Sequence, residues 1–137
     1  MKAQTKQSFL SLSFLITFSG IGYLLTDEFL STETLFGHEN HFTQSWWQAA
    51  HVFIGAFFLV ALGMLVSEHL RPKLLSKNLK RRRSGLTLLS LISLSSVSGY
   101  LILFVSSSNI EEIIELIHWV SGLFFAGALI YHLKFSK

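Results

Sequence analysis

The chain has 137 residues, half of them hydrophobic, with a net charge of +3 and a mean hydropathy of +0.50. It contains no cysteine, which excludes disulfides, thiolate-held iron–sulfur clusters and covalently attached c-type haem. A soluble domain of this length would not need several long apolar segments, so the composition favours a membrane protein.

Four apolar segments follow one another along the chain, at 9–25, 46–66, 86–105 and 113–133. Each approaches the ~20 residues with which an α-helix crosses ~30 Å of hydrocarbon, where the backbone must satisfy its own hydrogen bonds. The sequence therefore predicts an all-α, integral membrane four-helix bundle, one domain over 1–137. Lys2 and Lys6 are also typical of a secretory signal, but no small-residue cleavage site follows, so we expect an uncleaved first helix.

The basic residues are confined to the N-terminus, the loop at 71–83 and the C-terminus. The other two connections carry acidic residues and no Lys or Arg. The positive-inside rule then places both termini and the basic loop in the cytoplasm, in a multi-pass protein of the bacterial inner membrane. We expect the run at 80–83 to face anionic lipid, with no nucleic acid as partner. Pro72 is expected to end the second helix.

Two of the four segments carry paired histidines. His69 follows His51 by eighteen residues, and His132 follows His118 by fourteen. At ~100° per residue, eighteen residues return to the same helix face and fourteen fall ~40° short. The two helices run in the same direction, so His51 and His118 lie near the outer ends. Ionisable side chains in lipid are costly and need partners, so this pattern predicts two flat metal cofactors, one above the other.

The two halves of the chain also share short motifs. His51-x3-Gly55 aligns with His118-x3-Gly122. A second motif aligns Ser19, Gly22, Tyr23 and Leu24 with Ser96, Gly99, Tyr100 and Leu101. These matches predict two helix hairpins formed by an internal repeat. Glycines near the depths of the histidines would let porphyrin faces approach the backbone; they are Gly22, Gly55, Gly85, Gly99 and Gly122. Close helix packing is the alternative role for each.

Over roughly residues 8–133 these motifs resemble a small four-helix membrane cytochrome b, similar to the cytochrome b subunits of membrane oxidoreductases. The resemblance implies two haem b groups with bis-histidine ligation. His51 and His118 would bind the outer haem iron, and His69 and His132 the inner one. The fourteen-residue interval occurs at Gly85/Gly99 and His118/His132, and the eighteen-residue interval at His51/His69 departs from it.

This interpretation predicts a protein that carries electrons across the bilayer, with no catalytic residue of its own, as a subunit of a larger redox complex in the lipid bilayer. Expected partners are other membrane redox subunits and a c-type cytochrome on the acidic outer face. A quinone is a further candidate cofactor. The alternatives are a quinol-oxidising or quinone-reducing subunit, a protein with a single haem, and a haem-free structural or assembly subunit.

Three further groups of residues carry weaker hypotheses. Glu115, one turn before His118, could take protons from a quinol or stay solvated. The loop residues His38, Glu39 and His41 could bind a metal, although a solvated loop is the simpler interpretation. An aromatic belt at the membrane interface is expected from Trp46, Trp47 and Trp119.

Overall fold

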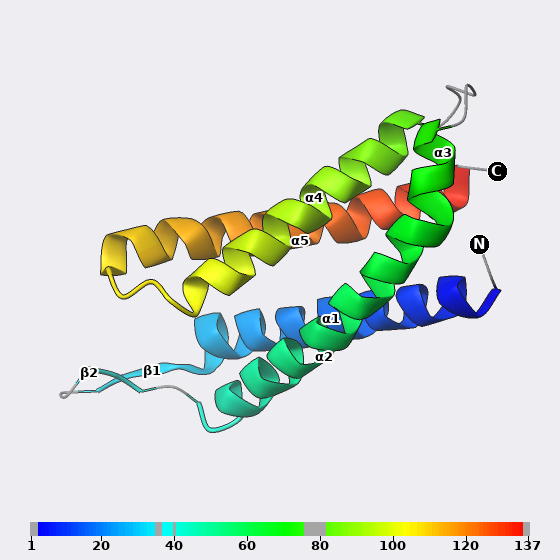
Figure 1. Ribbon diagram of the computed structural model, residues 1–137. Coiled ribbons are helices and arrows are strands. Elements are labelled where there is room, and N and C mark those ends of the chain that lie inside the picture. Colours follow the sequence, from blue (N-terminus) through cyan, green and yellow to red (C-terminus); the bar gives the residue numbers. More distant parts are fainter. Residues whose placement is uncertain (1–2, 35–36, 40, 76–81, 136–137) are drawn as a thin grey trace. The chain divides into compact units, whose positions relative to one another are not determined.

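The computed structural model describes residues 3–34, 37–39, 41–75 and 82–135. The chain forms two compact units, Met1–Pro72 and Lys73–Lys137. Each unit contains a hairpin of two antiparallel helices, and each is described here by itself (Figure 1). The predicted hairpins are therefore present. Part of the predicted basic loop, residues 76–81, lies outside the described residues.

The first hairpin pairs α1 (Ala3–Leu30) with α2 (Gln44–Leu65). The first helix extends beyond both ends of the apolar segment predicted at 9–25. The second helix begins two residues before the segment predicted at 46–66 and ends one residue before its predicted end. Their connection contains a short antiparallel ribbon of β1 (Thr32–Thr34) and β2 (Gly37–Glu39). The sequence did not predict this ribbon, because three-residue strands are too short to show an alternating pattern.

The helical backbone continues past α2 as a π turn, η1 (Val66–Leu70), and a short helix, α3 (Arg71–Leu75). The expectation that Pro72 ends the helix was therefore wrong. A proline ring clashes with the carbonyl four residues earlier, here that of Glu68. The π turn accommodates an extra residue just before that clash, and the Arg71 N–H donates to the carbonyl of Val66, five residues back.

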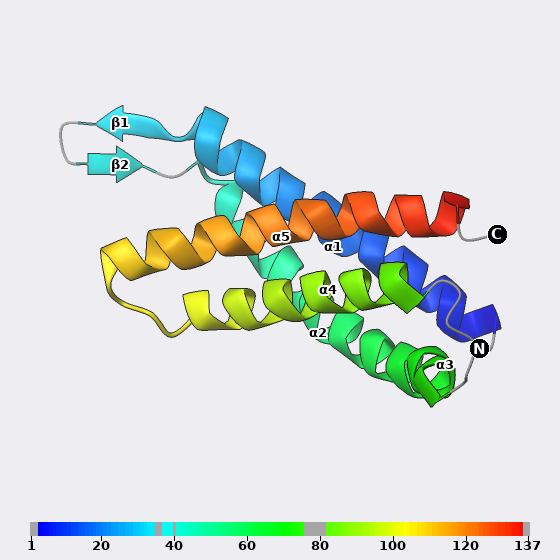
Figure 2. The same ribbon diagram turned by 90° about the horizontal axis from the view of Figure 1, so that it is seen from above.

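The second hairpin pairs α4 (Arg82–Ile102) with α5 (Ser108–Phe135), which run side by side in both ribbon views (Figure 2). The first of these ends three residues before the predicted boundary at 105. The second begins five residues before the predicted 113, and includes the acidic residues that follow Ser108. Acidic side chains in a first turn interact favourably with the positive end of the helix dipole.

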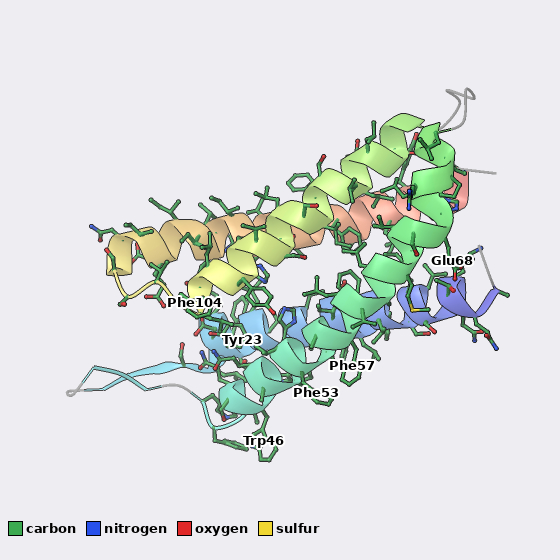
Figure 3. All side chains as sticks on the ribbon, in the orientation of Figure 1. Tyr23, Trp46, Phe53, Phe57, Glu68 and Phe104 are labelled. Atoms are coloured by element: carbon green, nitrogen blue, oxygen red, sulfur yellow. The ribbon has the colours of Figure 1, made fainter. Side chains whose placement is uncertain are left out.

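The surface of the helices is strongly apolar. All four are long and hydrophobic enough to span a membrane, with mean hydropathies between 1.6 and 2.3 over their most apolar stretches. Trp46, Phe53 and Phe57 project from α2 away from α1 (Figure 3), with 75%, 66% and 53% of their surfaces exposed. Apolar surface on this scale is unfavourable in water and suits hydrocarbon. The fold is that of a multi-pass membrane protein.

The contacts inside each hairpin are made mostly by small and hydroxyl side chains. Ser13 and Ser19 are buried on α1, and Ser98 and Ser121 in the second hairpin. Small residues let membrane helices approach closely, and their hydroxyls donate to carbonyls of the same helix. Larger apolar side chains are few in these interiors; Phe58 stacks on a phenylalanine of α1 at 5.6 Å between ring centroids.

Candidate functional site: two histidines clasped by serines

His51 of α2 packs against α1 within the first hairpin. Its Nδ1 lies 3.0 Å from Oγ of the buried Ser19. The same hydroxyl lies 3.0 Å from the carbonyl oxygen of Ile16. When its single proton goes to that carbonyl, Nδ1 of His51 is the donor to Ser19.

His118 of α5 packs against α4 in the same way, with stronger partners. Its Nδ1 lies 2.8 Å from the carbonyl oxygen of Ser95, a group that can only accept. The Ser98 hydroxyl lies 3.4 Å from the same nitrogen and donates to the carbonyl of Leu94 at 2.8 Å. The proton of a neutral His118 ring is therefore on Nδ1.

His118 and His51 can therefore be compared as metal ligands. With the proton on Nδ1, the lone pair of a neutral imidazole is on Nε2. A histidine that ligates a metal typically donates its other ring N–H to a nearby oxygen, which fixes the ring and raises its basicity. His118 has this arrangement, and the contact between His51 and Ser19 is compatible with it.

A glycine lies against each of these rings. A Cβ atom built on Gly20 would lie 3.0 Å from Cε1 of His51, and one on Gly99 would lie 2.7 Å from Cε1 of His118. Any larger residue would push the imidazole out of its place. A Ser–Gly pair, Ser19–Gly20 or Ser98–Gly99, therefore faces each outer histidine from the neighbouring helix.

This geometry changes the alignment of the two halves. The sequence comparison matched Gly22 with Gly99 because a tyrosine and a leucine follow both. In the structure the counterpart of Gly99 is Gly20. Gly22 instead faces Trp47, whose ring atoms would lie 2.7 Å from an added Cβ. Trp47 also meets Phe18 edge to face at 5.7 Å, so it packs within the hairpin.

The second helices keep the register that the sequence predicted. Gly55 faces Ile16 of α1, 3.7 Å from an added Cβ, and Gly122 faces Ser95 of α4 at 4.0 Å. The correspondence between the two helices continues beyond the His-x3-Gly motif. Three residues after each of these glycines lies a buried phenylalanine, Phe58 or Phe125. Gly55 and Gly122 thus contribute to packing inside the hairpins.

The end of the second hairpin that is nearer the C-terminus repeats the histidine–serine arrangement around His118. His132 has its Nδ1 3.0 Å from Oγ of Ser84. Ser84 precedes Gly85, and this pair lies fourteen residues before Ser98–Gly99, just as His132 lies fourteen after His118. An added Cβ on Gly85 would meet nothing within 4 Å. The second hairpin therefore carries the same histidine–serine contact at two depths.

The first hairpin does not keep this sequence pattern at its corresponding end. When His51 is matched with His118, the position of His132 is taken by Leu65. When Gly20 is matched with Gly99, the positions of Ser84 and Gly85 are taken by Thr5 and Lys6. His69 lies within the π turn instead. A π turn has a different angular spacing per residue from an α-helix, so the ~100° per residue of a continuous helix does not apply between His51 and His69. The sequence argument that His51 and His69 share one face does not hold across this turn.

The residues for which the sequence gave weaker hypotheses lie in different parts of the structure. Nδ1 of His41 lies 2.7 Å from the hydroxyl of Thr43, just before α2. His38 and Glu39 lie on β2. Glu115 is exposed on α5. Trp46 and Trp119 are exposed by 75% and 41%, as a membrane belt requires. Among the residues that the structure describes, no three His, Asp or Glu side chains gather as a metal cluster.

Sequence reasoning missed the serines that hold the histidines. Serines in membrane helices usually bond to their own backbone, as Ser98 does to the carbonyl of Leu94. The available signal was the Ser–Gly dipeptide, which occurs four times, at Ser19, Ser84, Ser98 and Ser121; the first three of these serines contact a histidine. Comparison with known proteins adds no relative: no family model, no curated protein and no solved structure matches the chain.

Proposed function

We propose that the chain is a membrane b-type cytochrome that carries electrons across the bilayer through two haems, as a subunit of a larger redox complex. The observation that carries the proposal is the common placement of His51 and His118, whose Nδ1 atoms each lie against an oxygen of the neighbouring helix. With the proton on Nδ1, the lone pair of each ring is on Nε2. That is the form of histidine that haem iron takes as an axial ligand.

The proposed ligand pairs take one histidine from each hairpin: His51 with His118 on the outer side, and His69 with His132 on the inner side. The donor set fits haem b, because the chain has no cysteine and a haem iron needs only two protein ligands. Haem, when bound, supplies the one-electron redox chemistry. The outer pair has the stronger support, since both of its members are held alike.

The rest of the chain has defined tasks in this proposal. Ser19, Ser95 and Ser98 orient the imidazoles, and the Ser95 carbonyl keeps the proton of His118 on Nδ1. Gly20 and Gly99 leave space for the rings against the helix backbone. The apolar helices limit the access of water, and the apolar shell around a metal site influences its redox potential.

Topology and partners belong to the same proposal. We place both termini and the basic loop in the cytoplasm of a bacterium, from the positions of the Lys and Arg residues. The acidic outer connections would attract a basic partner such as a c-type cytochrome. If this attraction operates, the association rate falls as salt is raised; a rate independent of salt would exclude it.

Haem content tests the proposal directly. The full chain, produced with ample haem and purified gently, should contain two low-spin b haems per chain in the reduced-minus-oxidised absorbance spectrum. One haem would restrict the proposal to a single pair of histidines. Folded protein without haem would contradict it.

A haem-free structural subunit is the second candidate, and one observation favours it. The outer histidines already make hydrogen bonds that tie the two helices of each hairpin together. Such contacts can stabilise a membrane hairpin without any cofactor. The two candidates differ in what replacement of a histidine does: loss of colour in a folded protein supports the cytochrome, and loss of the fold from colourless protein supports the structural role.

A further inference from the structure

The imidazoles of His118 and His51 contact different kinds of oxygen. Nδ1 of His118 lies 2.8 Å from the backbone carbonyl of Ser95, whereas Nδ1 of His51 lies 3.0 Å from the hydroxyl of Ser19. A carbonyl only accepts, so it keeps the proton of a neutral ring on Nδ1. A hydroxyl accepts or donates, so it is compatible with either tautomer. The second hairpin therefore restricts its histidine more narrowly than the first.

Both hairpins place a hydroxyl beside a carbonyl at this point. The Ser98 hydroxyl lies 3.1 Å from the carbonyl oxygen of Ser95, and the Ser19 hydroxyl lies 3.0 Å from that of Ile16. In each case the carbonyl belongs to the residue three positions before the serine. Because the two local patterns are the same, a different contact has to select the carbonyl as the partner of His118.

A pair of hydroxyls beside His118 provides that contact. Oγ of Ser95 on α4 and Oγ of Ser121 on α5 lie 2.7 Å apart, and Ser121 also donates to the carbonyl of His118 over 3.1 Å. With the bond from the ring to Ser95, these contacts close a circuit between the two helices. In the first hairpin the matching positions hold Ile16 and Ile54, whose side chains cannot form hydrogen bonds.

The hydroxyl pair also accompanies a closer approach of the helices. A Cβ atom built on Gly122 would lie 4.0 Å from Oγ of Ser95, and one on Gly55 would lie 3.7 Å from Cδ1 of Ile16. The isoleucine atom is one bond further from its backbone, yet it spans nearly the same gap. This comparison indicates that α4 lies closer to α5 than α1 does to α2. A closer α4 brings the Ser95 carbonyl towards the histidine ring.

From these contacts we propose that Ser121 is a positioning residue for His118. Its hydroxyl, bonded to that of Ser95, holds the Ser95 carbonyl against the ring and fixes the proton on Nδ1, with the lone pair on Nε2. His51 has no such hydroxyl pair beside it, and its ring occupies both tautomers. If the chain binds haem as proposed above, His118 is the ligand that is oriented in advance, and His51 is the ligand that adjusts.

The test measures the tautomers directly. The full chain is produced without haem, with nitrogen-15 in its histidine rings, and is kept in detergent at about pH 8, where imidazole in water is neutral. Nitrogen NMR distinguishes protonated from unprotonated ring nitrogens, and replacement of one histidine at a time assigns the signals. We expect the ratio of the Nδ1–H to the Nε2–H form to be about fivefold higher for His118 than for His51, the ratio that one hydrogen bond of ~1 kcal/mol gives. Equal ratios would overturn the proposal.

A serine variant tests the role of the hydroxyl pair. Ser121→Ala should lower the tautomer ratio of His118 about fivefold and leave that of His51 unchanged. Ser13→Ala is the matched control, because Ser13 is also buried and its hydroxyl donates to the carbonyl of Phe9 on its own helix. It should change neither ratio. An unchanged His118 ratio in folded Ser121→Ala would overturn the assignment.

The reciprocal variant keeps the proposal testable if Ser121→Ala does not fold. Ile16→Ser/Ile54→Ser places the hydroxyl pair in the first hairpin and leaves the second hairpin intact. The tautomer ratio of His51 should then rise about fivefold, towards that of His118. Folded double variant with an unchanged His51 ratio would overturn the proposal, because the hydroxyl pair would then not select the tautomer.

These outcomes are independent of haem binding. The orienting role of Ser121 is measured in the haem-free chain, and only the description of His118 as a ligand rests on the proposed function. A chain that binds two haems but shows equal tautomer ratios contradicts the positioning role alone. A chain with His118 fixed in one tautomer that takes up no haem contradicts the proposed function alone.

Discussion

The two hairpins place a histidine at the same point in different ways. Around His118 the second hairpin has a polar network: Ser95 and Ser121 hydroxyls lie 2.7 Å apart, and Ser121 donates to the carbonyl of His118. In the first hairpin the positions of Ser95 and Ser121 are taken by Ile16 and Ile54. A repeat can therefore keep the histidine and its facing glycine while the surrounding residues differ, polar in one hairpin and apolar in the other.

The hairpins differ more strongly at their inner ends. His132 is held by Ser84, whereas the first hairpin has Leu65 at the matching position and His69 beyond it in the π turn. The difference shows that the outer pair of histidines follows the repeat and the inner pair does not. The two proposed haems should then respond differently to substitution.

The largest effect is expected from the histidines themselves. His118→Ala should remove the outer haem and His132→Ala the inner one, so that each variant retains about one half of the haem of the two-haem protein, because each pair loses an axial ligand. Haem is measured per chain after extraction. His41→Ala, in the loop before α2, is the matched control and should retain both haems. Retention of both in all three variants would contradict the ligand assignment.

A relocated histidine tests the departure of the first hairpin from the repeat. His69→Leu should remove the inner haem if His69 is a ligand. The double variant Leu65→His/His69→Leu should restore it, because position 65 lies fourteen residues after His51, as His132 does after His118. The absorbance of the inner haem checks both steps. An unchanged inner haem in His69→Leu would show that the second ligand comes from elsewhere.

The glycines that face the rings should be less tolerant than glycines in open space. Gly99→Ala brings a Cβ to 2.7 Å from a histidine ring that two hydrogen bonds hold, and overpacking of this kind costs about 1–3 kcal/mol. Gly127, whose added Cβ would meet nothing within 4 Å, is the control. Thermal unfolding in detergent should show a lower melting temperature for Gly99→Ala alone. Equal melting temperatures would mean that the ring does not lie against α4.

The smallest effect is expected from the serines, and it should be unequal. Ser19→Ala removes the hydroxyl oxygen that contacts Nδ1 of His51, whereas Ser98→Ala leaves His118 bonded to the backbone carbonyl of Ser95. Loss of this hydrogen bond lowers the basicity of the ligand, so Ser19→Ala should shift the outer haem's midpoint potential by on the order of tens of millivolts, and Ser98→Ala by less. Redox titration measures both.

Exposed serines provide the controls for that comparison. Ser11→Ala on α1 and Ser93→Ala on α4 alter the same chemistry on the outward sides of the two helices and should leave the potential unchanged. A larger shift from Ser98→Ala than from Ser19→Ala would mean that the backbone carbonyl is not the principal partner of His118.

The sequence by itself determined the four membrane helices, the two hairpins and the match of His51 with His118. These follow from long-range composition and from a motif, His-x3-Gly, that keeps its helical spacing in both halves. Such features depend on the periodicity of one helix at a time, and so they can be read along the chain.

Only the tertiary structure decided which residues face the histidines. Gly20 and not Gly22 lies against His51, because the register between two helices is set by how their side chains interlock, and a one-dimensional alignment does not contain that contact. The contact between the Ser19 hydroxyl and Nδ1 of His51 also emerges only when both helices are in place. The π turn before Pro72 belongs here too, since a proline can end a helix or reshape it, and the local sequence permits both.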